Sequence, residues 1–334
     1  MKGDKNMYEY LMLNLQLFAE PNTNTTLDSG LSVQNKIFYD MTLIDEAQAE
    51  LVHDQFGQER PIPKNGGKKI EFRKFAALPK ALTPLTEGVT PDGKKLESSA
   101  IEAEVHQYGD YIVQSDMLEL TAIDNTIVEA TKLLGRQAGL TLDTITRNVL
   151  QSGTNVFYAP KADGTPVTSR AALDDTCKLT VDVVKRVVAF LKKNNAQKIN
   201  GDYVCILHPL CAYDLMSDPA WIDAHKYAQP ENIYNGEIGK VAGCRFVETT
   251  EAKIYEGGVF APIFLGANAY GKTKIEGGGL ETIIKQKGSA GTADPLNQRS
   301  SIGWKATKTA EILVQNYLIR VECKGALGEE AEVN

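Results

Sequence analysis

The sequence is poor in the features that assign a chemistry to a chain directly. Among 334 residues there are only 4 histidines and 5 cysteines, and aromatic residues make up 7%. No apolar run approaches the roughly 18 residues that suggest a membrane span. The cysteines are odd in number and scattered, which indicates reduced thiols and no disulfide framework. They are Cys177, Cys205, Cys211, Cys244 and Cys323. The chain is therefore expected to be neither a membrane-spanning protein nor a small disulfide-stabilised domain.

Positive charge is also in short supply. The chain has 36 Lys and Arg against 43 Asp and Glu, for a formal net charge of −7. Binding of phosphates requires a surplus of Lys and Arg on the contact surface. A protein whose main surface binds nucleic acid is therefore not expected. A container that holds nucleic acid without adhering to it stays compatible with this charge, because mild like-charge repulsion would favour it.

A short apolar segment near the start, Leu11–Ala19, has the length of a signal-peptide core. Asn14 and Gln16 interrupt it, and the residues before it carry as many acidic as basic side chains. We therefore do not expect a signal peptide.

Apolar residues are abundant enough for a folded body. They make up 43% of the chain, an ordinary share for a globular protein. Its 334 residues exceed the roughly 250–300 at which a single hydrophobic core stops growing. We therefore expect two packed lobes, or one domain with long excursions.

The first 120 residues predict such excursions. A segment of linker composition, residues 21–30, precedes a helix expected over Val33–Phe56. This arm needs its own body or a neighbour to bind. Further on, Lys69–Phe75 and Ser99–Val113 alternate apolar and polar residues as half-exposed strands do. Turn residues separate the two segments, which predicts an extended hairpin.

The two strands of this hairpin differ in charge. The return strand is acidic and the outgoing strand is basic. Acidic residues that face the basic ones disfavour binding of nucleic acid, so we expect the basic residues to contact another protein subunit. These predicted contact residues are Arg60, Lys64, Lys68, Lys69, Arg73, Lys74 and Lys80.

The strongest helical pattern lies in Ala122–Gln151, where apolar residues recur at spacings of three and four. Thr121 is predicted as its N-cap, and Ser152 and Gly153 end it. At 1.5 Å per residue such a helix would be roughly 45 Å long. It is expected to act as a structural beam.

Helices and strands alternate irregularly in the remainder. A helix is expected from Val181 behind the N-cap Thr180, then a buried strand over Tyr203–Leu207 and a short helix over Leu210–Met216. Strands predominate afterwards and end in a closing pair, 310–315 and 318–323. No regular βαβ repeat is present, which predicts the α+β class.

One motif suggests nucleotide chemistry. Gly266–Thr273 matches the phosphate-loop pattern G-x-x-x-x-G-K-[ST], in which backbone amides hold phosphates and a helix follows. Three consecutive glycines, 277–279, would break that helix. A strand followed by a turn is therefore the preferred interpretation. A nucleotide-binding enzyme that uses Lys272 and Thr273 stays open as an alternative.

Cys205, His208 and Cys211 are spaced three apart, which raises a zinc site or a Cys–His catalytic pair. No fourth ligand is close in sequence, and nothing orients the histidine as a base. We therefore expect core thiols here. The chain is predicted to have no catalytic, cofactor-binding or metal-binding residues and no enzymatic activity.

A series of blocks resembles the major capsid proteins of tailed bacteriophages, in particular the N4-type coat family. The stretch Leu265–Gly271 accounts for the accidental phosphate-loop match. The blocks are moderately specific singly and strongly specific in their order, and they span residues 14–325. They are Asn14–Ala19, Tyr203–Trp221, Asn235–Thr249, Leu265–Gly271, Asp294–Lys305 and the closing strands.

The resemblance implies the Johnson fold of tailed-phage and herpesvirus shells, first described in the Hong Kong phage. Applied to this chain, it implies an N-terminal arm (1–60) and an extended hairpin loop (61–117). The spine helix of a peripheral domain (118–155), an axial domain (156–290), and closing strands of the peripheral domain with a C-terminal tail (291–334) would follow. The arm, hairpin, beam and α+β body expected from the residues occur in the same order.

The resemblance also implies a non-catalytic major capsid protein. Hexamers and pentamers of the chain would form an icosahedral shell that encloses a dsDNA genome without sequence-specific binding, without a cofactor and without a membrane. Its place would be the virion, after assembly in the host bacterial cytoplasm. Portal and head decoration or completion proteins are implied partners, and the short arm predicts a separate scaffolding protein and little or no processing. Bacterial encapsulins share the fold, so an encapsulin-like cage stays open as an alternative.

Overall fold

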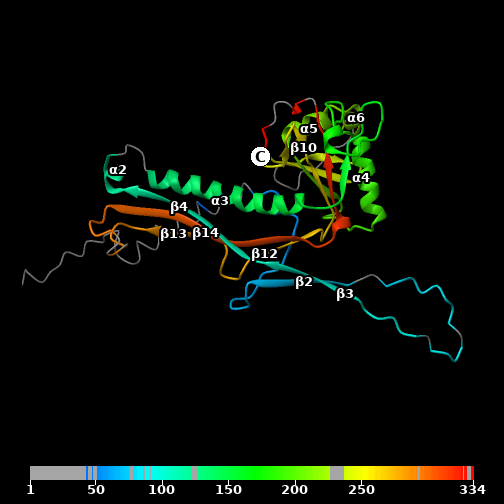
Figure 1. Ribbon diagram of the computed structural model, residues 1–334, viewed down its shortest axis with the longest axis horizontal. Helices are drawn as coiled ribbons and strands as arrows, with labels where there is room; N and C mark the ends of the chain where they lie inside the picture. Colours follow the sequence, from blue (N-terminus) through cyan, green and yellow to red (C-terminus); the bar gives the residue numbers. More distant parts are fainter. Residues whose placement is uncertain are drawn as a thin grey trace, which may run out of the picture.

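The protein is elongated, with a helical and β-sheet body at one end and a long hairpin that extends beyond it (Figure 1). The computed structural model describes residues 43, 47, 51–75, 78–85, 87–90, 92–121, 126–225, 237–289, 291, 294–325, 327–328 and 332–334. Most of the predicted arm lies outside these residues. Leu43 and Ala47 are helical and buried. Residues 53–56 form turns, so the predicted helix does not continue to Phe56.

The predicted beam is helix α3 (Thr126–Gln151), which runs along the long axis of the molecule (Figure 1). Its buried residues Ala130, Leu134, Ala138 and Leu142 recur every four positions and face strand β14 (Arg299–Ile312). The predicted N-cap is wrong. Thr121 ends a separate short helix, α2 (Asp116–Thr121), where its hydroxyl donates to the carbonyl of Met117.

A five-stranded sheet lies against α3, and we call it the spine sheet. Strand β14 is long enough to pair with β4 (His106–Ser115) and β13 (Glu281–Lys285) over its first part and with β12 (Tyr270–Thr273) over its last. Strand β1 (Gln58–Glu59) adds to β12 in parallel. Even-numbered residues of β14, Ile302, Trp304 and Ala306, are buried with α3 in one cluster. The odd-numbered residues therefore face away from the helix.

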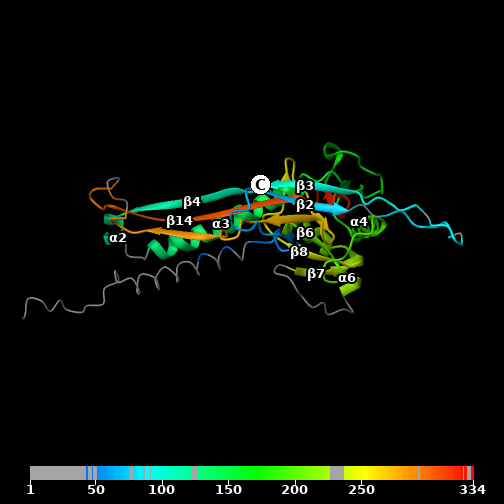
Figure 2. The ribbon, with the colours of Figure 1, turned by 90° about the horizontal axis from the view of Figure 1, so that it is seen from below.

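The hairpin is confirmed in its outgoing strand and altered in its return strand. Strand β2 (Lys69–Phe75) pairs antiparallel with β3 (Ser98–Glu104). The predicted return strand over Ser99–Val113 is divided at the buried residue Val105. Its second half is β4, which belongs to the spine sheet, and Figure 2 shows β3 and β4 following one another along the molecule.

The compact end of the molecule contains a six-stranded sheet in the order β5-β15-β11-β6-β8-β7, which we call the axial sheet. Helix α4 (Val181–Lys193) covers it with five buried valines and Leu191. As predicted, Thr180 caps this helix by accepting from the amide of Val183. The other elements are β5 (Val156–Tyr158), β6 (Tyr203–Leu207), α5 (Pro209–Met216), α6 (Pro219–His225), β7 (Glu237–Val241), β8 (Cys244–Glu248), β9 (Ile254–Tyr255), β10 (Val259–Phe260), β11 (Ile263–Leu265) and β15 (Leu318–Glu322).

The predicted closing pair of strands is wrong. Strand β14 lies in the spine sheet, whereas β15 lies between β5 and β11 in the axial sheet. A 3-10 turn, Gln315–Tyr317, carries the chain from one sheet to the other. The residues of β12 and β13, expected in the axial domain, likewise belong to the spine sheet. Within the described residues, no helix is both long and apolar enough to cross a bilayer.

Candidate assembly surfaces and the ionic junction at the hairpin root

The seven predicted contact residues, which we call the basic strip, are all exposed along the hairpin root, β2 and the segment that follows it. Lys69 pairs with Glu102 at 3.6 Å, and Arg73 pairs with Glu71 at 3.3 Å. Both basic side chains are more than 60% exposed, and ion pairs of this kind contribute little. The other five form no ion pair with a described residue. The return strand therefore neutralises less of the strip than the sequence suggested, in part because Glu71 stands opposite Glu102.

A second feature of the hairpin was missed at the sequence level. From the last residue of β2 onward, its large apolar side chains are 58–81% exposed among the described residues. Their irregular spacing in a turn-rich segment concealed them, although large apolar residues in a segment without a packing partner are an informative signal. We call them the tip surface: Phe75, Leu78, Leu82, Leu85, Val89 and Leu96.

A corresponding apolar surface lies at the far end of the spine sheet. Residues of β4, α2 and the loop before β14 expose it, and we call it the distal surface: Tyr111, Val113, Met117, Leu118, Leu120 and Leu296. Next to it, on the sheet face that points away from α3, is a cavity of about 470 Å³ lined by Gly109, Tyr111 and Gly303. A Cβ atom at Gly303 would lie 2.7 Å from that of Tyr111. The absence of a side chain at Gly303 therefore leaves room for Tyr111 and keeps this face of the spine sheet open.

The tip surface and the distal surface lie at opposite ends of the long axis (Figure 1). They cannot meet within one chain in this conformation. Exposed apolar surfaces of this kind mark sites of contact with another protein.

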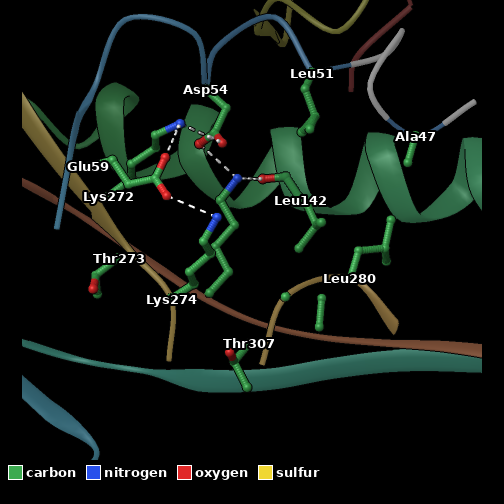
Figure 3. A pocket seen from close by; sticks show the side chains of 13 residues that line it. Ala47, Leu51, Asp54, Glu59, Leu142, Lys272, Thr273, Lys274, Leu280 and Thr307 are labelled. Atoms are coloured by element: carbon green, nitrogen blue, oxygen red, sulfur yellow. Dashed lines mark hydrogen bonds and ion pairs between the residues drawn. The ribbon is translucent and has the colours of Figure 1, made fainter. Parts of the chain in front are cut away.

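The root of the hairpin is joined to the body by five alternating charges, which we call the ionic ladder (Figure 3). The Nζ atom of Lys308 lies 2.8 Å from Asp54, and Lys272 bridges Asp54 at 3.4 Å and Glu59 at 3.3 Å. Lys274 completes it at 2.9 Å from Glu59. The ladder runs from the buried Lys308 to the half-exposed Lys274 along the wall of a cavity of about 300 Å³.

Beside the ladder, a buried pair ties the end of the arm to the spine helix. His53 Nδ1 lies 2.6 Å from Asp143 Oδ2, and the amide of His53 donates to Asp143 Oδ1 at 2.7 Å. Both side chains are at most 1% exposed. Tyr270 of β12 donates its hydroxyl to the carbonyl of His53. Helix α3 and strands β12 and β14 therefore all contact residues 53 and 54. These contacts position the segment that enters the hairpin.

The phosphate-loop match does not form a phosphate loop. The amine of Lys272 is held in the ionic ladder, and Thr273 donates its hydroxyl to the carbonyl of Arg60. Residues 274–279, all described, form an isolated bridge and a turn in place of a helix. The first half of the pattern contains a turn at residues 267–268, and its second half is strand β12, which is hydrogen-bonded on both edges, to β1 and to β14.

The Cys205, His208 and Cys211 group does not converge on one point either. His208 Nδ1 accepts from the amide of Leu210 at 3.2 Å and caps α5, while its ring stacks on Phe260. Burial lowers the pKa of His208. Cys211 contacts Cys323 instead. Among the described residues, no three His, Cys, Asp or Glu side chains are placed to hold a metal ion.

The ionic ladder predicts a loss of stability in acid. Burial acts to raise the pKa of Asp54, but Lys308 and Lys272 outweigh it and hold that pKa below its usual value. The hydrogen bond from Lys274 lowers the pKa of Glu59. Carboxylates with lowered pKa values stabilise the fold above their unfolded pKa values, and this contribution is lost as pH falls through the folded values.

We therefore expect the wild-type chain to lose more unfolding free energy between about pH 5 and about pH 3 than the variant Asp54→Asn/Glu59→Gln. Urea unfolding at a series of pH values measures this difference. Parallel curves for the two proteins would show that Asp54 and Glu59 do not cause the loss of stability in acid.

A known sequence family and several solved structures are similar to this chain. Residues 98–318, two thirds of the chain, match the sequence family described as phage capsid protein. No curated protein matches the chain.

Solved structures share the fold at low sequence identity. A capsid of the cyanophage P-SCSP1u is 14% identical with a TM-score of 0.64, and covers 83% of this chain and 89% of its own. A capsid subunit of cyanophage Pam1 is 13% identical with a TM-score of 0.65, over 81% and 89% of the two chains. The SrpI encapsulin of Synechococcus elongatus is 8% identical with a TM-score of 0.52, over 81% and 86%. The fold is thus shared by phage capsids and an encapsulin, and it does not distinguish them.

Proposed function

Because this chain belongs to the phage capsid protein family and is a major capsid protein of the head shell, we propose that its hairpin is the element that joins each subunit to the next. The tip surface of one copy would pack on the distal surface and the adjacent open sheet face of its neighbour. The observation that carries this proposal is the separation of two exposed apolar surfaces at opposite ends of one molecule.

The geometry favours a heterologous contact. A surface that binds a different surface of an identical copy generates a closed ring when the rotation closes, and an open chain when it does not. Rings of this kind would be the hexamers and pentamers of an icosahedral shell. A contact repeated around every ring makes the assembled state hard to leave, even where each contact is modest.

The basic strip would add orientation to this apolar contact. Its five residues without an ion pair among the described residues would lie against acidic surface of the neighbour. Charge complementarity mainly increases the rate and specificity of association. The strip would therefore guide the hairpin into place, and the tip surface would hold it there.

We expect simultaneous reversal of charge at Lys68, Lys69, Arg73 and Lys74 to Glu to leave a folded subunit that does not close shells. All four side chains are exposed, so the subunit core is unaffected. Negative-stain electron microscopy and size-exclusion chromatography measure assembly, and circular dichroism checks folding. The matched control changes the three lysines to Arg and leaves Arg73 unchanged, which keeps every charge. Normal particles from the reversed variant would contradict the role of the strip.

The proposal extends to the subfamily, the enclosed genome, the domains and the partners of the shell. The ordered sequence blocks support placement among the N4-type coats. The net charge of −7 supports a shell that encloses dsDNA without adhering to it. We further propose a peripheral domain that contains the spine sheet and α3, and an axial domain that contains the axial sheet. A scaffolding protein, a portal and decoration or completion proteins would be separate chains, with assembly in the host bacterial cytoplasm. Co-expression with the candidate scaffolding protein tests that assignment by whether shells become uniform in size.

An encapsulin-like cage is the second candidate, because an encapsulin shares the fold. The match of two thirds of the chain to a phage capsid family favours the head shell. A nucleotide-binding enzyme has less support, since the amine of Lys272 is held by two carboxylates. Nucleotide binding that is lost in Lys272→Ala would revive it.

A further inference from the structure

The axial sheet is assembled from two segments that are far apart in the sequence. Residues 156–265 supply β5, β6, β7, β8 and β11, after which the chain leaves to build β12, β13 and β14 of the spine sheet. It returns only at β15, which inserts between β5 and β11. Hydrogen bonds, apolar contacts and the ion pair of Arg170 with the buried Glu322 join this returning strand to the rest of the domain. The two segments therefore meet along a seam that runs on both edges of β15.

Two cysteines face each other across this seam. Cys211 lies in the first turn of α5, on the first segment, and Cys323 directly follows β15. Their Sγ atoms are 3.6 Å apart, and both residues are at most 1% exposed. A disulfide requires a separation of about 2.05 Å, so the sulfurs need to approach by roughly 1.5 Å. A shift of that size is within reach of small rotations of the two side chains.

Phe260 contacts the chain on both sides of the cysteine pair. Phe260 exchanges two backbone hydrogen bonds with Cys323, of 2.8 and 3.1 Å. Its ring stacks on His208, the residue that caps α5 just before Cys211. The two sulfur atoms are thus brought together by a rigid arrangement and not by a loose loop.

The remaining cysteines supply a contrast within the same core. Cys177, Cys205 and Cys244 are also fully buried in the axial core. Cys211 and Cys323 are the two among these five described residues whose sulfurs are in contact. Contact with Cys323 together with burial raises the pKa of the Cys211 thiol well above its usual value. The thiolate is therefore scarce, and reaction of the pair is slow while the domain stays closed.

We propose that Cys211 and Cys323 form a redox-sensitive staple across the seam of the axial domain. In a reducing compartment both remain thiols. With a low-molecular-weight disulfide such as oxidised glutathione, one thiolate attacks the reagent and releases one glutathione thiol. The second cysteine then attacks the mixed disulfide and releases the other. Two protein thiols are oxidised to one disulfide, and one glutathione disulfide is reduced to two thiols.

The staple would link the two segments of the axial sheet, which are far apart in the sequence. It closes a loop of more than one hundred residues that contains the whole excursion through the spine sheet. Cross-links that close long loops restrict the unfolded chain most. The oxidised chain would therefore resist detachment of β15 and global unfolding. This inference does not depend on the role proposed for the hairpin, because both cysteines lie within one subunit.

The test uses the full chain, equilibrated in glutathione buffers of increasing oxidised-to-reduced ratio until its composition stops changing. It is carried out on the native chain and on chain refolded in the same buffers, where access to the thiols is not limiting. Peptide mapping after alkylation identifies any linked pair, and urea unfolding compares the oxidised and reduced chains. Cys211→Ala removes one partner. Cys205→Ala is the matched control, because Cys205 is equally buried in the same core.

The expected result is one linked peptide that joins Cys211 to Cys323 in the wild-type and Cys205→Ala chains and is absent from Cys211→Ala. The oxidised wild-type chain should unfold at a higher urea concentration than the reduced chain, and Cys211→Ala should show no such difference. Five free thiols in refolded chain at the most oxidising ratio would overturn the proposal. A different linked pair, or a link that leaves the unfolding midpoint unchanged, would overturn it as well.

Discussion

A subunit that carries Leu82→Ser, Leu85→Ser and Val89→Ser is expected to remain folded and to form no closed shells. These three side chains are between 63% and 81% exposed, so they contribute almost nothing to the core of the subunit. When buried against a neighbour, each Leu would contribute roughly 1.5–3 kcal/mol of apolar burial. The loss recurs at every contact of every ring, and this makes failure of assembly the expected result.

Circular dichroism and urea unfolding measure the fold of this variant, and electron microscopy measures its assembly. The control substitutes Leu82→Met, Leu85→Met and Val89→Ile, which keeps the apolar surface. Closed particles of normal size from the serine variant would contradict the proposed role of the tip surface.

A mixing experiment separates a heterologous contact from a symmetric one. A second variant, Tyr111→Ser/Val113→Ser, keeps the tip surface and alters the distal surface. If the contact is heterologous, the serine tip variant offers a competent distal surface to the competent tip of the second variant. The mixture should then form one-to-one dimers and stop there, whereas neither variant alone should associate. Tip-to-tip pairing predicts instead that the second variant associates by itself.

The second large effect is expected at the buried pair of His53 and Asp143, at the root of the hairpin. Replacement of Asp143 by Ala is expected to lower the unfolding free energy by about 3–5 kcal/mol. Both carboxylate oxygens of Asp143 accept hydrogen bonds from His53, one from the ring and one from the backbone amide. Their removal leaves two polar groups of His53 buried without this acceptor, and such groups are costly in an apolar interior.

Urea unfolding measures this change, with Asp182→Ala as the control. Asp182 pairs with Arg186 on the exposed face of α4, where a loss of about 0.3–0.5 kcal/mol is expected. Replacement of both partners, His53→Leu/Asp143→Leu, should recover part of the stability, because the imidazole is then removed and only the backbone amide of residue 53 lacks its acceptor. A single variant as mild as Asp182→Ala would mean that the pair is not buried in solution.

Local patterns in the sequence determined the helices and the more isolated strands. The apolar spacing of α3, the cap at Thr180 and the buried strand Tyr203–Leu207 each depend on residues within a few positions of one another. The order of arm, hairpin, beam and α+β body follows from these signals. The seven residues of the basic strip were found in the same way, since charge and exposure in a polar hairpin need no distant partner.

Strand partners were decided by the tertiary structure. Alternation of apolar and polar residues shows that a segment is extended, but it does not say which strand lies beside it. The continuous pattern over Ser99–Val113 therefore hid the change of partner from β2 to β14 at Val105. For the same reason the last two strands appeared as a pair, although β15 returns to the axial sheet.

The ionic ladder was beyond reach of the sequence for a related reason. Lys272 and Asp54 are separated by 218 positions, and long-range contacts such as the pairing of β1 with β12 bring them together. The same pairing turns a phosphate-loop pattern into an ordinary strand. What the sequence determined about this capsid protein is its local structure and its surface charge. Which buried charges meet, and which apolar surfaces stay open to another copy, was decided by contacts between segments far apart in the chain.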